Sequence, residues 1–325
     1  MTLKPHLACD VDLTKVKWPM LALPKIDGVR GLNLDGNITG RSLKAFKNKF
    51  VADCFSNEAF LGFDGELVLG DWTSPTLCAD TTGFVNRKTA KPGKPTASPD
   101  FKWYIFDYLA PQAINKPYLE RLTIVSDLIE ALWAGEPNTV PNVFVVPATM
   151  VHSLEEFLQL EEHWLDVGFE GAILRDPEGM HKSGRATVKT GAYLRLKRFI
   201  DFEGEVVEII EAMENTNEAK TNELGRTERS THQENMVPKG MVGMVKKRSL
   251  ADVLDPLSGK VLIAKDQIVD VGPGKMLHED RIKFFKQPEL LIGQVWKSKF
   301  FPKGHKDKPR FPTLVCPRAA EDMSE

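Results

Sequence analysis

The sequence changes character near residue 200, and this change constrains the fold more than any other feature. Before it, stretches that alternate apolar and polar residues are mixed with stretches that carry apolar residues at helical spacing. After it come short strand-like stretches separated by turns: EGEVVEIIEA, MVGMVKKRSL, LIAKDQIVDVG and GQVWKSKF. This pattern predicts an α+β domain over residues 1–199 and a small β-barrel over residues 200–325. With 325 residues, the chain is long enough to build two cores.

Several elements can be placed from their residue patterns alone. GLNLDGNITGR alternates around its Asp-Gly pair and predicts a hairpin, and FLGFDGELVLG and FKWYIFDYLA predict strands. Helical spacing of apolar residues predicts helices over residues 118–135 and 153–168. In the second of these, Ser153 and Glu156 have the spacing of an N-terminal capping box. A polar insertion over about residues 213–235 separates the first two strands of the predicted barrel.

Composition limits the class of protein. The chain is 42% hydrophobic and 27% charged, which disfavours global disorder. It has four cysteines and no C-x-x-C pair, which disfavours both a four-cysteine zinc site and a disulfide framework. No apolar run is long enough for a signal peptide or a membrane span. We therefore expect a cytoplasmic protein without a membrane partner.

Charge is segregated locally although the net charge is only −2. Residues 281–310 carry nine Lys or Arg against two acidic residues, with aromatic residues interleaved. Clustered cations of this kind are what contacts to nucleic-acid phosphates require. Two interpretations stay open at this point, a solvated rim beside a small core and a surface that follows a phosphate backbone.

Five short motifs precede the predicted barrel in a fixed order: KIDGVR, FDGEL, YIFDY, FEGAILRDP and YLRLKRF, which begin at residues 25, 63, 104, 169 and 193. Each alone has an ordinary structural interpretation, such as a turn, a core aromatic residue or a solvated strand face. The order is more informative than any single motif, because it places a lysine, two glutamates and two further cations before a basic β domain.

Lys25 is the candidate nucleophile. Attack of an amine on phosphorus needs a neutral nitrogen, whereas a free lysine has a pKa of about 10.4 and is mostly protonated at neutral pH. Burial and nearby cations, including metal ions, lower the pKa of such an amine. Lys25 follows the apolar run MLALP, which favours burial. We therefore expect a lowered pKa for Lys25.

The ordered motifs resemble the covalent nucleotidyltransferase superfamily, which comprises ATP-dependent DNA ligases, RNA ligases and mRNA capping enzymes. The stretch DKPRFPTLVCPRAAED resembles the C-terminal arginine signature of the DNA ligases, so that the resemblance covers about residues 20–318. The layout is similar to that of the compact bacteriophage ligases. It implies a nucleotidyltransferase (adenylation) domain of antiparallel sheets with flanking helices, followed by an oligonucleotide-binding (OB-fold) barrel.

The resemblance assigns roles to cations of the first domain. Lys25 matches the lysine that becomes adenylylated, and Lys197 and Arg195 match residues that bind the α-phosphate. Arg30 and Arg41 match positions that contact the ribose and the phosphates of a nick. The family often has a glutamate two residues before the lysine, where this chain has Leu23, so adenine recognition is expected to rest on backbone groups.

Carboxylates, an aromatic ring and two further arginines complete the implied site. Glu66 matches the carboxylate that holds the ribose hydroxyl, and Glu170, together with Glu66, is expected to bind the metal. Phe106 matches the ring that stacks on adenine, with Tyr104 as the alternative. In the C-terminal signature, residues of the barrel orient the pyrophosphate leaving group; here they are Arg310 and Arg318.

The resemblance also implies cofactors and partners. These are ATP, Mg²⁺ for which Mn²⁺ can substitute, and nicked double-stranded DNA, which a monomer would encircle in a bacterial cell or a phage-infected host. The alternatives within the superfamily are an RNA ligase and an mRNA capping guanylyltransferase. The alternative from another class is a non-catalytic protein that binds nicks or single strands through its barrel.

Overall fold

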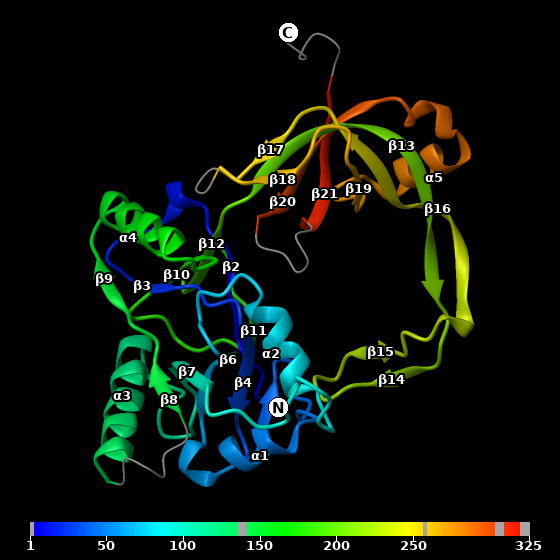
Figure 1. The fold of residues 1–325 in the computed structure, drawn as a ribbon. Helices are drawn as coiled ribbons and strands as arrows, with labels where there is room; N and C mark the ends of the chain where they lie inside the picture. Colours follow the sequence, from blue (N-terminus) through cyan, green and yellow to red (C-terminus); the bar gives the residue numbers. More distant parts are fainter. Residues whose placement is uncertain (1–2, 136–141, 256–258, 303–308, 319–325) are drawn as a thin grey trace. The chain divides into compact units, whose positions relative to one another are not determined.

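The computed structural model describes residues 3–135, 142–255, 259–302 and 309–318 (Figure 1). The chain divides into two compact units, Met1–Lys197 with Glu223–Gly225 and Arg198–Asn222 with Arg226–Glu325. None of the described helices is long and apolar enough to cross a membrane.

Two five-stranded sheets form the framework of the first unit. The strand order of one is β2-β12-β10-β3-β9, with bounds Cys9–Asp10, Tyr193–Lys197, Gly171–Arg175, Met20–Pro24 and Thr149–Val151. The order of the other is β5-β4-β6-β7-β8, with bounds Ile38–Gly40, Val29–Asn33, Phe63–Leu69, Phe101–Tyr108 and Val143–Val145. Most neighbours are antiparallel, and β12 with β2 and β7 with β8 are parallel. A short parallel pair, β1 (His6–Leu7) and β11 (Gly184–Arg185), completes the strands.

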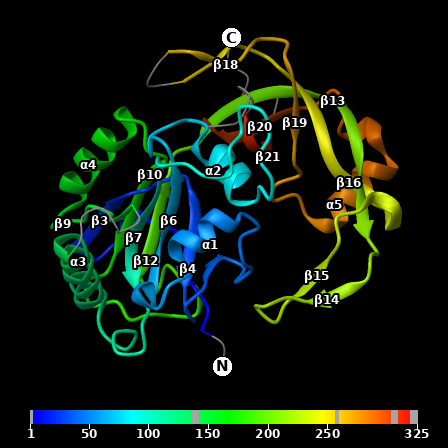
Figure 2. The same cartoon turned by 60° about the horizontal axis from the view of Figure 1, so that its bottom comes forward.

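Four helices flank these sheets, with bounds α1 Lys49–Phe55, α2 Leu77–Val85, α3 Tyr118–Gly135 and α4 Leu154–Asp166. Helix α3 packs on β7 and β8 of the second sheet. Helix α4 packs on β10, β3 and β9 of the first sheet (Figure 2). At the start of α4, Ser153 accepts a hydrogen bond from the Glu156 N–H at 3.2 Å. The Glu156 carboxylate accepts from the His152 N–H, one residue earlier than in a standard capping box. Buried aromatic residues such as Trp103, Phe55 and Phe157 fill the core between the layers.

The predicted hairpin over residues 31–41 forms between β4 and β5. Asn33 pairs with Ile38 across the turn, and Gly36 has φ +85°, a backbone conformation that favours glycine. This hairpin lies at the edge of the second sheet and begins with the strand that carries Arg30.

The second unit is built on an antiparallel sheet in the order β19-β16-β13-β20-β21, with bounds Ile268–Val271, Met236–Ser249, Ile200–Asn215, Val295–Phe301 and Arg310–Pro317. A bridge between Gly272 and Thr313 joins the two edge strands and closes the sheet into a barrel. Helix α5 (His278–Lys286) packs on β16. Figures 1 and 2 show β13 and β16 side by side beyond the barrel, as far as the hairpin of β14 (Ala219–Thr221) and β15 (Thr227–Arg229), which occupies the predicted polar insertion.

Aromatic residues of the basic segment 281–310 mostly serve the barrel core. Trp296 and Phe300 on β20 are buried, and Phe284 and Phe285 pack against the same cluster. Phe301, which alternates to the other face of β20, packs against Phe199 with ring centroids 4.7 Å apart. Four of the five interleaved aromatic residues therefore pack in or against the barrel core. Two lie on β20, where inward positions alternate with the lysines, and two lie on helix α5.

A lysine is buried inside the barrel. Lys247 is 0% exposed, and its Nζ donates hydrogen bonds to the Trp296 carbonyl and to Ser298 Oγ, both at 2.6 Å. Its Nζ also lies 4.5 Å from the centroid of the Phe202 ring. On β13, an added Cβ at Gly204 would lie 2.6 Å from the Arg248 carbonyl oxygen and 3.2 Å from Lys247 Cε, so the glycine allows close approach of β16 and its lysine stem. Burial lowers the pKa of Lys247 to about 7.

Candidate active site

Three charged residues from distant parts of the sequence meet at one end of neighbouring strands. Lys25 directly follows β3, and its N–H donates to the Gly171 carbonyl at 2.9 Å while its carbonyl accepts from the Glu170 N–H at 3.1 Å. On the other side of β10, Gly171 pairs with Lys197. The β3-β10-β12 order therefore brings Lys25, Glu170 and Lys197 together.

Glycine at position 171 allows this close approach. Gly171 has φ +150°, and an added Cβ would lie 2.3 Å from the Leu196 carbonyl oxygen on β12. A side chain at this position would push β10 and β12 apart and move Glu170 away from Lys197. The Glu-Gly pair of the fourth motif thus has a structural reason as well as a chemical one.

Glu170 lies between the two lysines. Its carboxylate accepts a hydrogen bond from the Nζ of Lys25 through Oε2 and from the Nζ of Lys197 through Oε1. The Glu170 side chain is 5% exposed, against 18% for Lys25 and 16% for Lys197. Burial raises the pKa of Glu170, but the two lysines outweigh it and hold that pKa well below its usual range.

The two lysines differ in their electrostatic surroundings. Burial lowers the pKa of Lys25, but Glu170, Glu66 and Asp27 together bring it above its ordinary value. The pKa of Lys197 is lowered, first by burial and then by the nearby charge of Lys25. The expectation of a lowered pKa for Lys25 is therefore wrong for the protein chain by itself, because carboxylates surround this lysine more closely than cations do.

Arg30 is held firmly on the second sheet. Its Nε donates to Asp64 Oδ1 at 2.8 Å, its Nη2 donates to Asp64 Oδ2, and its Nη1 donates to the His6 carbonyl at 2.8 Å. The guanidinium carbon lies 5.0 Å from the centroid of the Phe106 ring. Arg30 pairs with Glu66 in the register of β4 and β6, so the two side chains share one face. Burial raises the pKa of Glu66 to about 8.

The two candidate adenine-stacking rings have different neighbours. Tyr104 is stacked on Trp72 with ring centroids 4.6 Å apart and on Phe144 with centroids 5.5 Å apart. Phe106, two residues along β7, has Arg30 beside its ring. The Tyr104 ring is thus occupied by aromatic packing, whereas the Phe106 ring lies with the charged residues.

Two of the predicted phosphate-binding arginines are placed less centrally. Arg195 lies two residues before Lys197 on β12 and shares its face, and its Nε donates to Asp10 Oδ1 at 2.7 Å. Arg41 lies in the turn after β5 and is exposed. The structure therefore groups Lys197 with Lys25 and keeps Arg41 at the surface.

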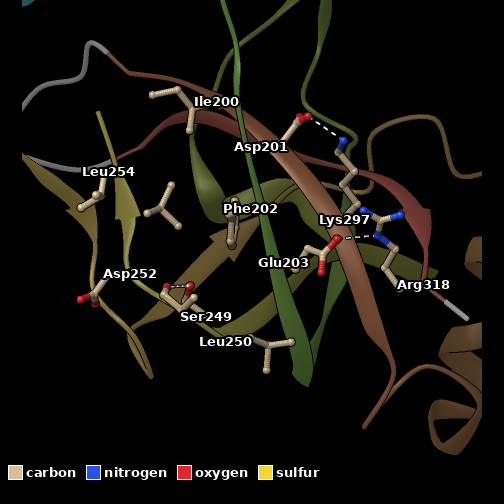
Figure 3. Close-up of a pocket in the computed structure, with 12 residues that line it drawn as sticks. Ile200, Asp201, Phe202, Glu203, Ser249, Leu250, Asp252, Leu254, Lys297 and Arg318 are labelled. Carbon is tan, nitrogen blue, oxygen red and sulfur yellow. Dashed lines mark hydrogen bonds and ion pairs between the residues drawn. The ribbon is translucent and has the colours of Figure 1, made fainter. Parts of the chain in front are cut away.

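The remaining predicted arginines belong to the second unit. Arg310 begins β21, with its guanidinium carbon 5.4 Å from the ring centroid of Phe311. Arg318 follows the end of the same strand and pairs with Glu203 on β13. Arg318 and Glu203 line a pocket of about 500 Å³ within this unit (Figure 3). The expected role of both arginines toward pyrophosphate stays a prediction.

A buried charge network joins the two sheets at the far end of β10 from Glu170, and sequence reasoning missed it. Asp107 accepts from Arg121 Nε and Arg175 Nη2, both at 2.7 Å, and all three side chains are at most 2% exposed. The Arg175 guanidinium also lies 3.7 Å from the ring centroid of Tyr118. The signal in the sequence is a charge within an apolar strand, in IFDY and in AILR.

Carboxylates near Lys25 fit a metal that is shared with phosphates. In the described ranges, no group of three or more His, Cys, Asp or Glu could hold a metal ion alone. Mg²⁺ is usually bound by one or two carboxylates plus substrate phosphates and waters. Glu170 and Glu66 are the carboxylates that would hold such an ion, and both raise the pKa of Lys25.

Comparison with known proteins identifies the fold. No known family and no curated protein matches the chain by sequence. A Lig E DNA ligase structure matches with a TM-score of 0.67 and 19% identity, over 98% of this chain and 100% of that one. The chain has the fold of a DNA ligase. A structure named Pmar-Lig matches with a TM-score of 0.66 and 20% identity, over 97% of this chain and 68% of that one.

A Chlorella virus DNA ligase-adenylate structure also matches, with a TM-score of 0.49 and 26% identity, over 98% of this chain and 99% of that one. The DNA ligase fold confirms the predicted class, an α+β adenylation domain of antiparallel sheets with flanking helices and an OB-like barrel after it.

Proposed function

We propose that this protein is an ATP-dependent DNA ligase that seals nicks in duplex DNA through a Lys25–AMP intermediate and a 5′-adenylylated DNA intermediate. The observation that carries the proposal is the meeting of Lys25, Glu170 and Lys197 at one end of three neighbouring strands. A nucleophile, a carboxylate and a second cation in contact are the groups that transfer of a nucleotide to an amine requires. The DNA ligase fold supports the same conclusion.

In the first step, Lys25 Nζ forms a bond to the α-phosphorus of ATP, and the bond to pyrophosphate breaks. Lys25 must first release a proton to solvent, because Glu170 and its neighbours raise its pKa, and the nitrogen releases a second proton to solvent once the bond to phosphorus has formed. Lys197 would leave Glu170 for the α-phosphate and stabilise the charge that develops there. Mg²⁺, bound at Glu170, would supply positive charge that neutralises the phosphates and favours the neutral amine.

Other residues of the first unit would bind the nucleoside. Glu66, whose pKa is raised to about 8, would hold the ribose hydroxyl. Phe106 is the better candidate for stacking on adenine, because the Tyr104 ring already packs on two aromatic rings. Arg30, Arg41 and Arg195 would contact the ribose and the phosphates.

The later steps would use both parts of the chain. AMP would pass to the 5′-phosphate at the nick, and attack by the 3′-hydroxyl would release AMP and seal the strand. Residues 200–325 would act as an OB-fold domain, with Arg310 and Arg318 orienting pyrophosphate in the first step and the basic segment 281–310 holding DNA afterwards. We propose that a monomer encircles the duplex, in the cytoplasm of a bacterial cell or a phage-infected host.

The first experiment measures the intact mass of the denatured protein after incubation with Mg²⁺ and ATP, GTP or NAD, beside the Lys25→Ala variant. Bound AMP is first removed with pyrophosphate. We expect an AMP adduct from ATP alone, absent in the variant. A GMP adduct would indicate a capping enzyme. No adduct from any nucleotide would refute the enzymatic proposal and leave a nucleic-acid-binding protein.

Substrate choice needs a second measurement. Nicked duplexes with DNA or RNA on either side of the nick are offered to the adenylylated protein, and sealed strands are separated on a denaturing gel. We expect sealing of the all-DNA nick to be fastest. Faster joining of RNA ends would favour an RNA ligase instead.

A further inference from the structure

The outward face of β13 carries three carboxylates at alternating positions, each paired with a cation from another part of the barrel. The pairs are Asp201 with Lys297, Glu203 with Arg318, and Glu205 with Arg248. The Asp201 pair measures 2.7 Å and the Glu205 pair measures 3.8 Å. The opposite face of β13, with Phe202 and Val206, belongs to the core. The acidic row is therefore a built feature of the barrel surface.

Arg318 is fixed at two points. Its backbone N–H donates to the Val295 carbonyl at 2.8 Å, which holds the chain against β20 after the end of β21. Its side chain donates through Nε to Glu203 Oε1 (Figure 3). An arginine side chain has many rotamers, and a charge-assisted bond at Nε selects among them and sets the direction of the guanidinium plane.

The Glu203–Arg318 pair keeps access to solvent. The Arg318 side chain is 31% exposed and the Glu203 side chain is 36% exposed. Both residues line the pocket of about 500 Å³, and Asp201 and Lys297 line it too. Figure 3 shows both dashed contacts on the same side of the pocket. A ligand anion can thus approach the guanidinium without unfolding the barrel.

We infer that Glu203 is a positioning residue for Arg318 in the reaction of Lys25 with ATP. The inference rests on the proposed function, in which Arg318 orients the pyrophosphate leaving group. Negative charge builds up on the pyrophosphate as it leaves, and a guanidinium that is already oriented toward it stabilises the transition state without first losing conformational freedom. Glu203 itself touches neither the nucleotide nor the nick.

A purely structural role for the pair makes a different prediction. Ion pairs between partly exposed side chains contribute little to folding stability. A structural role would therefore give Glu203→Gln the same small effect on every step. A positioning role confines the effect to the step in which pyrophosphate leaves.

The test compares Glu203→Gln with the matched control Asp201→Asn, which breaks the neighbouring pair on the same strand face. Two rates are measured on the full-length protein: formation of Lys25–AMP as a function of ATP concentration, and sealing of a pre-adenylylated DNA nick without ATP. We expect Glu203→Gln to lower kcat/KM for the first reaction about tenfold. Sealing of the pre-adenylylated nick and both rates of Asp201→Asn should stay within about twofold of wild type.

The conservative variant Glu203→Asp provides a second readout, because it keeps the carboxylate and should recover part of the lost Lys25–AMP formation. The inference is overturned if Glu203→Gln matches Asp201→Asn in the first reaction, or if it slows both reactions equally. A wild-type protein that forms no Lys25–AMP would refute the proposed function and this inference with it. Normal adduct formation in both wild type and Glu203→Gln would refute the inference alone.

Discussion

Lys247 makes the stability of the barrel depend on pH in a way that can be calculated. Its pKa in the folded protein is about 7, because burial disfavours the ammonium. In an unfolded chain, a lysine has a pKa of about 10.4. Between these values the unfolded chain binds a proton that the folded chain does not, so stability rises with pH. The slope approaches about 1.4 kcal/mol per pH unit, and the gain from pH 7 to pH 9 is about 2 kcal/mol.

Lys247→Met isolates this contribution because it keeps an apolar stem of similar length and removes the charge. The variant leaves the Trp296 carbonyl and Ser298 Oγ without the lysine donor, at a cost of about 1–3 kcal/mol. This cost does not depend on pH. We therefore expect the free energy of unfolding of wild type to rise by about 2 kcal/mol relative to that of the variant between pH 7 and pH 9.

The assay is urea unfolding at pH 7, 8 and 9, with the variant Lys246→Met as the control. Lys246 is the next residue along β16, and it pairs with Glu208 at 2.7 Å on the outer surface. The control should keep the pH dependence of wild type. If the free energies of unfolding of Lys247→Met and wild type change equally with pH, within about 0.5 kcal/mol, burial of Lys247 does not cause the pH dependence of stability and the reasoning fails.

Two further substitutions test the framework of the site. Asp107→Asn removes the carboxylate that two buried arginines share and should lower the free energy of unfolding by about 3–5 kcal/mol in urea; a loss below about 1 kcal/mol would contradict this. Gly28→Ala would place a Cβ 2.3 Å from the Leu67 carbonyl oxygen, so we expect about 1–3 kcal/mol of destabilisation and slower Lys25–AMP formation. Gly83→Ala, on helix α2 with no atom nearer than 4.0 Å, should leave Lys25–AMP formation unchanged and raise stability by at most about 1 kcal/mol, because alanine favours a helix. An equal loss in both glycine variants would count against the steric argument.

The fold could be predicted in outline because local patterns and packing agree. Alternation around Asp35-Gly36 gave the β4–β5 hairpin, and helical spacing gave both ends of α3 and the ends of α4 within two residues. The lysines of β20 alternate with core residues, so strand periodicity also explains why Trp296 and Phe300 face inward.

The pKa shifts and the buried ion pairs could not be predicted from the sequence. The pKa of Lys25 depends on burial and on Glu170, Glu66 and Asp27. Asp27 is close in sequence, but Glu170 and Glu66 come from distant segments that the fold brings near the lysine. Asp107 and Arg175 were missed as a network because a charged residue in a strand usually faces solvent. The two residues lie on strands of different sheets, β7 and β10, so only the packing of one sheet against the other brings their charges together in the core.

The pairing of Gly171 with Lys197 has a consequence for how such a site can be lost or inherited. Side chains alternate between the two faces of a strand, so a shift of β12 by a single residue against β10 would replace Lys197 by Leu196 or Arg198 beside Glu170. Insertions and deletions in this strand would therefore abolish the lysine–glutamate–lysine contact even if every motif residue were kept. Changes in length are tolerable in the connections, such as the long hairpin between β13 and β16, because their register does not align Lys25, Glu170 and Lys197.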